Sequence, residues 1–377
     1  MGSQLAAQIE ESAAWVARNR SSEALLDGLT QGGCMICGAG GYGRQVAAAL
    51  REKGIAVHGF IDRNAVPGTM LDGIPLVTRG DVVPAEAAKW TAVIAINNFQ
   101  TSIEEVVAWA AGLFGNTVFV PELPDVVDPA LGNYWQGARD LVTRNADSIA
   151  RLYERLADQT SRDILAGLVA YRQKAAPQFH PLVDRENQYF ARDLLLPQAE
   201  LHVIDCGAWP GDMVGSARAA GQPIVGWYAF EPDPQNHAAL AEVAREAGIE
   251  SAALFPCGVG EIPGMVSFAA GSADASHAVE PATAGASMVP IVRVDDVVEA
   301  ERIDMVKLDI EGFEAQALNG MMRTLERHRP RLCMAIYHKP ADLWELPLAI
   351  ADQFPEARLA IRQHGYNGYD TVLYADL

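Results

Sequence analysis

Apolar and polar positions alternate along two stretches of the chain in the way that short strands and amphipathic helices do when they follow one another. In the first stretch, the pattern predicts a helix over residues 5–26 and then short strands with helical segments between them. The strands are expected at residues 34–37, 57–61, 74–77, 92–96 and 117–120, and the later helices at 46–50 and 103–110. This order predicts an α/β unit with a mostly parallel sheet.

A second set of apolar runs fills the C-terminal half. Helical segments at 236–247 and 314–327 follow the early strands, whereas the last two strands are joined by the short polar segment 364–370. The strands are expected at residues 201–204, 226–230, 253–256, 305–308, 332–336, 358–362 and 371–374. Alternating strands and helices closed by a hairpin predict a seven-stranded Rossmann-like sheet whose last strand runs antiparallel.

The length indicates more than one domain, because 377 residues exceed the roughly 100–200 residues of an ordinary domain. A helical pattern separates the two α/β regions, and Pro177 and Pro181 end it. The predicted order is an N-terminal helix (1–30), a smaller Rossmann-like domain (31–125), a helical connector (126–183) and a larger C-terminal domain (184–377).

The composition indicates which kinds of partner the protein has and in which cellular compartment it is expected. The formal charge of −19 argues against a nucleic-acid partner, which would need clustered Lys and Arg. No window approaches the ~18 apolar residues of a membrane span, so we expect a cytoplasmic protein with no membrane partner, and a homo-oligomer stays open. The five cysteines lie mostly in apolar runs and are expected to be reduced and buried, Cys34 and Cys37 on opposite faces of one strand.

A glycine turn follows the first strand of the C-terminal half. Asp205 ends this strand and leads into Gly207, Ala208, Gly211 and Asp212, at the edge where open α/β sheets place their ligands. Glu231 ends the next strand, where a carboxylate can accept both hydroxyls of a ribose. The turn lacks the Lys-Ser/Thr ending of a P-loop, so the pattern favours an adenosine cofactor over an NTPase site.

Polar residues also end the two strands that follow. Lys307, Asp309 and Glu311 share one side of an extended run in the sequence Val306-Lys-Leu-Asp-Ile-Glu-Gly312. The next strand ends on His338. Four neighbouring strand ends are therefore expected to meet over one cleft.

These motifs resemble the FkbM-type family of class I methyltransferases over residues 187–377. The resemblance is carried by Gln188-Tyr-Phe190, Ile204-Asp-Cys-Gly-Ala208, Phe230-Glu-Pro-Asp-Pro234, Lys307-Leu-Asp-Ile-Glu-Gly312, Tyr337-His-Lys-Pro340 and Thr371-Val-Leu-Tyr374. It implies a class I methyltransferase fold and S-adenosylmethionine held through Asp205, Gly207 and Glu231, with Ala208, Gly211, Asp212 and Asp309 beside it. The residues Trp209-Pro210 differ from those usually found at this point of the family's glycine loop.

The resemblance implies methyl transfer, most naturally to a hydroxyl of a sugar, glycan or natural product, with an N-methyl acceptor or a non-catalytic nucleotide-binding protein as alternatives. His338 is the preferred general base, because imidazole titrates near neutral pH. Asp309 or Glu311 holds His338, orients the acceptor or takes the proton directly, or all three bind a divalent metal. Lys307 is the fourth candidate catalytic residue. Each of the four has a structural alternative, including Lys307 as an ion-pair partner of Asp309 and His338 as a strand cap. The Ala/Gly/Ser-rich tract 269–287 is expected to be a loop, either a mobile lid that contributes to acceptor choice or an inert insertion.

The N-terminal half carries a second glycine motif. Gly38, Gly40 and Gly43 fit the dinucleotide fingerprint, and Asp62 ends the following strand. With residues 68–75, this part resembles the N-terminal Rossmann-like domain of bacterial sugar acyltransferases, which implies a nucleotide or sugar-nucleotide site. A domain kept for packing or dimerisation, and an oxidoreductase with a nicotinamide cofactor, are the alternatives.

Overall fold

The computed structural model describes residues 2–66, 68–132, 136–138, 140–173, 182–269, 277–278 and 287–377. The chain divides into two compact units that interleave along the sequence. Unit 1 comprises residues 1–154, 162–182 and 365–369, and unit 2 comprises residues 155–161, 183–364 and 370–377. Each unit is described below by itself.

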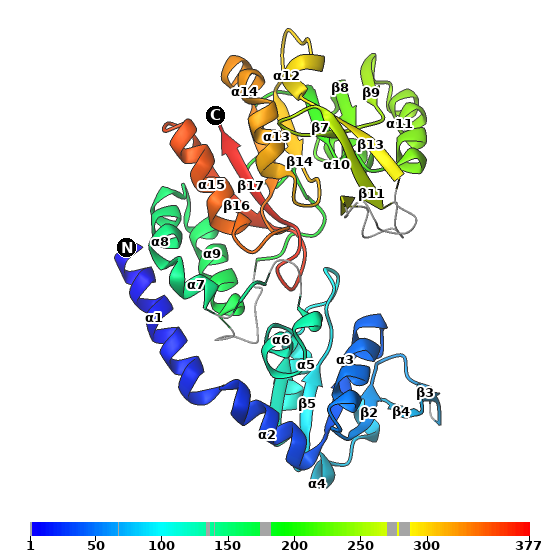
Figure 1. The fold of residues 1–377 in the computed structure, drawn as a ribbon. Helices are drawn as coiled ribbons and strands as arrows, with labels where there is room; N and C mark the ends of the chain where they lie inside the picture. Colours follow the sequence, from blue (N-terminus) through cyan, green and yellow to red (C-terminus); the bar gives the residue numbers. More distant parts are fainter. Residues whose placement is uncertain are drawn as a thin grey trace. The chain divides into compact units, whose positions relative to one another are not determined.

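Unit 1 contains a six-stranded sheet in the order β3-β4-β2-β1-β5-β6 (Figure 1). All neighbouring pairs are parallel except β3 with β4. The strands are β1 (Cys34–Cys37), β2 (Val57–Ile61), β3 (Met70–Leu71), β4 (Ile74–Val77), β5 (Thr91–Ile94) and β6 (Asn116–Phe119). The mostly parallel sheet is confirmed, and β1, β2 and β4 have the predicted bounds.

Two helices replace the one predicted over residues 5–26, because the chain turns at Arg20 and Ser21. Helix α1 spans Gly2–Asn19, and α2 spans Ser22–Gly32 with the Ser21 hydroxyl accepting the N–H of Ala24. The Arg20 guanidinium forms a bidentate pair with the fully buried Glu122. This pair fixes the turn, and Ser is a residue that favours a new helix start.

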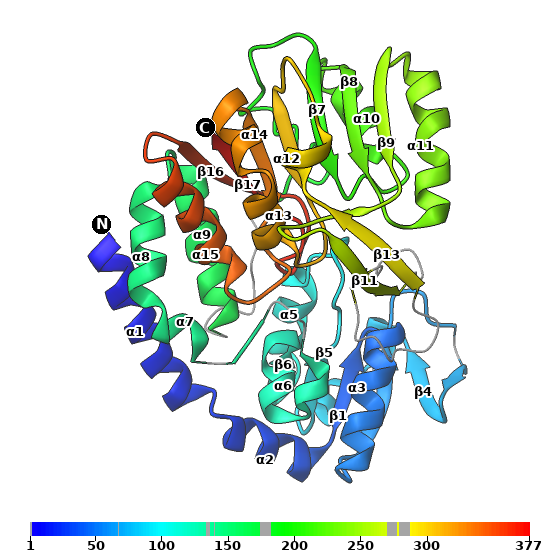
Figure 2. The same ribbon diagram turned by 45° about the horizontal axis from the view of Figure 1, so that its top comes forward.

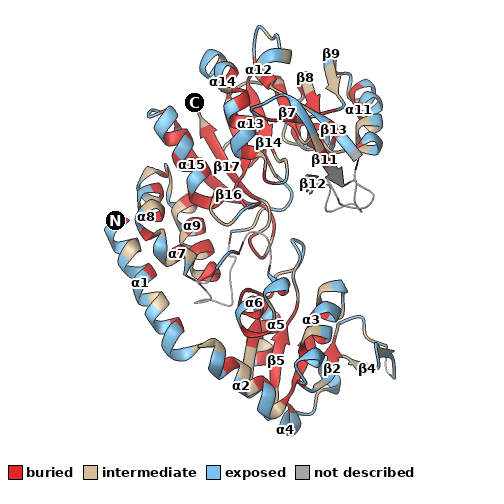
Figure 3. Cartoon of the chain, in the orientation of Figure 1, coloured by how far each residue is buried: buried red, intermediate tan, exposed pale blue. Residues whose placement is uncertain are grey.

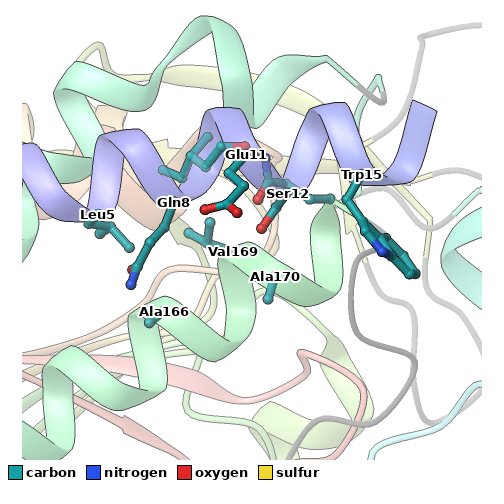
Figure 4. Close-up of a pocket in the computed structure, with 10 residues that line it drawn as sticks. Leu5, Gln8, Glu11, Ser12, Trp15, Ala166, Val169 and Ala170 are labelled. Atoms are coloured by element: carbon teal, nitrogen blue, oxygen red, sulfur yellow. Dashed lines mark hydrogen bonds between the residues drawn. The ribbon is translucent and has the colours of Figure 1, made fainter. Parts of the chain in front are cut away.

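The remaining helices of unit 1 cover the sheet or form a separate group. They are α3 (Gly41–Glu52), α4 (Pro84–Ala87), α5 (Glu104–Ala111), α6 (Leu123–Val126), α7 (Leu141–Arg144), α8 (Ala146–Arg155) and α9 (Gln159–Arg172), the last two shared with unit 2 at their ends. A pocket of about 380 Å³ lies between α1 and α9 (Figure 4). Its walls are mostly apolar side chains, from Trp15 of α1 to Val169 of α9, with the polar Gln8, Glu11, Ser12 and Gln173 among them.

Unit 2 contains the predicted seven-stranded sheet, in the order β16-β17-β15-β14-β7-β8-β9 (Figure 2). The strands are β7 (Leu201–Cys206), β8 (Ile224–Phe230), β9 (Ser251–Phe255), β14 (Met305–Leu308), β15 (Arg331–Ala335), β16 (Arg358–Gln363) and β17 (Thr371–Asp376). Strand β17 runs antiparallel to both of its neighbours, and the other pairs are parallel. The predicted hairpin closure is therefore confirmed.

The helices of unit 2 are α10 (Asp212–Ala219), α11 (Pro234–Ala247), α12 (Val294–Val297), α13 (Glu314–Gly320), α14 (Met322–His328) and α15 (Asp342–Gln353). The single helix predicted over 314–327 is wrong, because the helical hydrogen bonding is interrupted at Met321, whose ψ is 13°. A small second sheet of β10 (Gly258–Val259), β11 (Gly264–Ala269), β12 (His277–Ala278) and β13 (Ser287–Val292) was not predicted. Most of the tract 269–287 lies outside the described residues, but its His277–Ala278 segment is a strand rather than loop.

Each unit has its own apolar core. Figure 3 shows buried residues along the central strands of both sheets and exposed residues on the outer faces of the helices. Phe60, Val93 and Val118 are fully buried in unit 1, as are Val203 and Trp227 in unit 2. All five cysteines are free and buried, as predicted. Among the described residues, no helix is both long and apolar enough to cross a membrane.

Candidate functional site

The glycine turn of unit 2 is fixed by backbone contacts at the carboxyl ends of β7, β8 and β14, which are neighbours in the sheet. The N–H groups of Gly207 and Ala208 both donate to the carbonyl of Phe230, at 2.9 and 3.0 Å. Gly207 has φ +77°, and a Cβ there would lie 2.0 Å from the carbonyl oxygen of Asp309. Only glycine fits this turn, which holds the loop tightly against the start of the 309–312 segment.

Glu231 holds the same loop from the next strand. Its carboxylate accepts the N–H of Trp209 and the N–H of Asp233, both at 2.8 Å. Burial raises the pKa of Glu231, and these two backbone donors oppose the shift. Each carboxylate oxygen keeps a second lone pair, so the group can still accept ribose hydroxyls. Trp209 adopts φ +51°, so the unusual sequence of the loop at this position coincides with an unusual backbone conformation.

Asp205 and Lys307 form a buried ion pair below the loop. They lie opposite one another in the register of β7 and β14, and Lys307 Nζ is 3.2 Å from Asp205 Oδ1. Lys307 also donates to the carbonyl of Gly207, and Trp227 Nε1 donates to Asp205 Oδ2. Burial alone would lower the pKa of Lys307, but the carboxylates of Asp205, Asp309 and Asp212 raise it. Lys307 therefore pairs with Asp205, where the sequence suggested Asp309.

Asp309 and Glu311 do not continue the strand as the alternation predicted. Strand β14 ends at Leu308, and Glu311 adopts φ +56° in the following turn. This turn still brings Asp309 and Glu311 to the same group, His338, while Lys307 stays buried beside Asp205. The predicted convergence of the two acids and the histidine is present, although the extended backbone that suggested it is not.

Carboxylates face both ring nitrogens of His338. Nδ1 is 2.7 Å from Glu314 Oε1, and Nε2 is 3.3 Å from Asp309 Oδ1 and 3.6 Å from Glu311 Oε2. The side chains of His338 and Glu314 are each 1% exposed, whereas Asp309 is 20% and Glu311 40% exposed. The two acids on the Nε2 side are therefore the members of the cluster that solvent reaches.

This environment gives His338 an alkaline pKa. Burial alone would lower this pKa. The charge and hydrogen bond of Glu314 oppose burial, and with the charges of Asp309 and Glu311 they raise the pKa to about 10. Conversely, burial would raise the pKa of Glu314, and the His338 charge and hydrogen bond lower it overall. The cluster therefore favours an imidazolium at neutral pH, which cannot accept a proton. This geometry argues against the role of general base expected from the sequence.

Sequence reasoning did not assign Glu314 of this cluster to the site, nor the three residues around it, which are Tyr189, Asp342 and Asp370. The Tyr189 hydroxyl donates to Asp309 Oδ2 at 2.5 Å, and Glu314 accepts the N–H of Ile310 at 3.0 Å. The pKa of Asp370 is raised to about 6, mainly by burial and next by the charge of Asp309. The pKa of Asp342 is also raised to about 6, mainly by burial and next by the charge of Glu314. Glu314 is the first residue of α13, a place where acids are common, so nothing in the sequence separated it from a simple helix-start residue.

The same cluster is the group of described residues best arranged to offer metal ligands. Asp309, Glu314 and His338 each present one ligand atom within 4.8 Å of the others. Carboxylate and imidazole ligands suit several divalent cations. A cation held there would share these carboxylates with His338 and would have to displace the proton that they favour on the ring.

Comparisons with known proteins agree with this geometry. Residues 205–367 match the model of the Methyltransferase FkbM domain. None of the curated proteins matches the chain significantly. Among solved structures, methyltransferase FkbM from Methylobacillus flagellatus KT shares 20% identity and a TM-score of 0.76, with 100% of each chain covered.

Weaker matches extend over part of the chain. An rRNA methylase from Streptococcus thermophilus shares 16% identity and a TM-score of 0.30, covering 48% of this chain and 87% of its own. The fibrillarin of Aeropyrum pernix, solved with natively bound S-adenosyl-L-methionine, shares 14% identity and a TM-score of 0.28, covering 49% and 70%. The matched residues 205–367 contain the glycine loop, Glu231 and the His338 cluster. Residues 205–367 are therefore a methyltransferase domain of the FkbM type, and the chain is an S-adenosylmethionine-dependent methyltransferase.

Proposed function

We propose that the methyl acceptor is a hydroxyl group, on a sugar, glycan or natural product, that Glu311 takes its proton and that Asp309 orients it. The observation that carries this proposal is the difference in exposure within the cluster. Asp309 and Glu311 are partly exposed, whereas His338 is buried behind them.

Proton release is the reason for favouring a hydroxyl. When a hydroxyl oxygen attacks the methyl group, the sulfonium becomes a neutral thioether and the acceptor gives up its proton. A carboxylate in hydrogen-bond reach of the hydroxyl takes that proton as the C–O bond forms. A neutral amine attacks through its free lone pair, so it needs no such acceptor during the transfer.

Glu311 is the better placed proton acceptor. Its side chain is the more exposed of the two, whereas Asp309 already accepts a hydrogen bond from Tyr189. We assign Asp309 to orienting the acceptor, and we assign His338 to holding both carboxylates in place as a cation. In this assignment His338 is a positioning residue.

The cofactor contacts follow from the loop that Glu231 holds. Glu231 would accept the ribose hydroxyls, beside the turn that Gly207, Ala208 and Gly211 form. Asp212 begins α10, and its own carboxylate accepts the N–H of Met213. Asp205 is fully buried and already paired, so we assign Asp205 and Lys307 to supporting the loop from below.

The acceptor class is tested with S-adenosylmethionine labelled with ¹³C at the methyl group. The protein is incubated with matched panels of hydroxyl and amine acceptors, and NMR of the products distinguishes O-methyl from N-methyl carbons. The proposal predicts O-methyl products whose formation slows roughly a hundredfold or more in Glu311→Gln. Glu326→Gln, an exposed acid on α14, is the control and should keep full activity. N-methyl products alone, or unchanged turnover in Glu311→Gln, would contradict the proposal.

A further inference from the structure

A cavity lies within unit 1, and none of the residues assigned to methyl transfer lines it. It has a volume of about 740 Å³ and is lined by the glycine turn after β1 and by residues that follow β2, β4 and β5. These strands are neighbours in the sheet order β4-β2-β1-β5. The cavity therefore opens at the carboxyl edge of a parallel sheet, where open α/β sheets bind ligands, and it falls within the ~300–1,000 Å³ of small-molecule sites.

The three glycines of the turn occupy different surroundings. Gly38 has φ +106° and donates its N–H to the carbonyl of Ile61. A Cβ on Gly43 would lie 2.0 Å from the carbonyl oxygen of Gly38, so Gly43 is required where α3 packs against the turn. A Cβ on Gly40 or Gly41 would meet nothing within 4 Å. Packing therefore explains Gly38 and Gly43, whereas the backbone at Gly40 and Gly41 is bare and borders the cavity.

This bare backbone is the start of a helix. Gly40 caps α3 without a side-chain hydrogen bond, so no side chain of the cap covers the N–H groups of the first turn. Such groups bind anions, and phosphates in particular. Arg63 and Arg79 also line the cavity as cations that can contact a phosphate, although Glu105, another lining residue, pairs with Arg79.

Asp62 supplies the complementary group on the wall. One carboxylate oxygen accepts the N–H of Ala39 at 3.1 Å, and the other accepts the N–H of Asn64 at 2.9 Å. The carboxylate is thereby oriented beside the glycine turn, and each oxygen retains a second lone pair for a ligand hydroxyl. An acid at the end of the second strand is suited to ribose hydroxyls.

We propose that this cavity binds a nucleoside diphosphate, with ribose hydroxyls on Asp62 and the diphosphate on the backbone N–H groups at the start of α3. The ligand is the nucleoside diphosphate part of a nucleotide sugar or of a dinucleotide. The inference is independent of the proposed acceptor, because it concerns binding in unit 1.

The test is calorimetric titration of the full-length protein, saturated with S-adenosylhomocysteine so that adenine nucleotides cannot report on unit 2. Titrants are UDP, UDP-glucose, ADP and NAD⁺. Binding of UDP and UDP-glucose supports the proposal with a nucleotide sugar as the source, and binding of ADP and NAD⁺ supports it with a dinucleotide. No binding of any of the four at millimolar concentration would overturn it.

Two variants locate the binding. Asp62→Asn should weaken nucleotide affinity about tenfold or more, because a charged acceptor of ribose hydroxyls is lost. In Gly41→Glu the new side chain enters open space, and an acid in the first turn of α3 is favoured by the helix dipole, so the variant should fold. Its negative charge should repel the diphosphate. The control is Asp72→Asn, which removes an exposed acid that pairs with Arg44 outside the lining residues. Nucleotide affinities of Asp62→Asn and Gly41→Glu equal to that of the control would place the ligand elsewhere and overturn the proposal.

Discussion

At the scale of single residues, His338 decides how the site works. A histidine at a strand end suggests a base, because the ordinary pKa of imidazole is close to neutral. Sequence identified His338, Asp309 and Glu311 correctly as neighbours. It could not show that Glu314 lies on the opposite ring nitrogen, where its charge opposes the effect of burial and favours the protonated ring.

The protonation of His338 predicts a specific pH dependence. Its pKa is raised from 6.5 to about 10, so the folded state favours the protonated form. The stability that this charge contributes is complete below pH 6.5 and is lost as pH rises towards 10. We expect kcat/KM to stay level from about pH 7 to 9 and to fall towards pH 10. A rise in kcat/KM with a midpoint near pH 6.5 would instead identify neutral His338 as the base.

Glu314 is expected to act through His338. Glu314→Gln removes the largest favourable charge facing His338 but keeps an oxygen that can accept from Nδ1. The pKa of His338 should fall, so the alkaline loss of kcat/KM should move to lower pH while the affinity for S-adenosylmethionine is unchanged. If the pH profile of this variant overlays that of the wild type, Glu314 has only a structural role.

At the scale of elements, strands were easier to predict than helix boundaries. Buried strands such as β1 and β14 are short apolar runs with clear ends, and the predicted bounds match. The breaks at Ser21 and Met321 interrupt continuous helical patterns and depend on contacts such as Arg20 with Glu122. Helix α15 was missed, and it contains Pro347, a residue that normally argues against a helix.

The glycine turn is the element whose conformation most directly shapes the cofactor site. Gly207→Ala should destabilise the protein by about 2 kcal/mol or more, because its Cβ would overlap the carbonyl of Asp309 at a positive φ. Gly215→Ala is the matched control, since it lies in α10 with open space and should be neutral or stabilising by ~0.5–1 kcal/mol. Thermal unfolding measures both. Equal melting temperatures for the two variants would show that the turn tolerates a side chain.

At the scale of the whole molecule, the two units share one local design. In each, a glycine with positive φ follows the first strand, and an acid at the end of the second strand accepts an N–H from the turn: Asp62 from Ala39, and Glu231 from Trp209. The motifs and their order were visible in the sequence. The hydrogen bonds that orient the two acids depend on the folded backbone and were not.

Calorimetric titration of the full-length protein measures whether unit 2 binds S-adenosylmethionine through Glu231, as we propose. Glu231→Gln keeps an acceptor for the loop N–H groups but loses the charge that would hold the ribose hydroxyls. Glu242→Gln, an exposed acid on α11, is the control. We predict one bound S-adenosylmethionine per chain for the wild type and Glu242→Gln, and affinity about tenfold or more weaker for Glu231→Gln. Absence of binding to the wild type, or equal affinity in Glu231→Gln, would contradict the account.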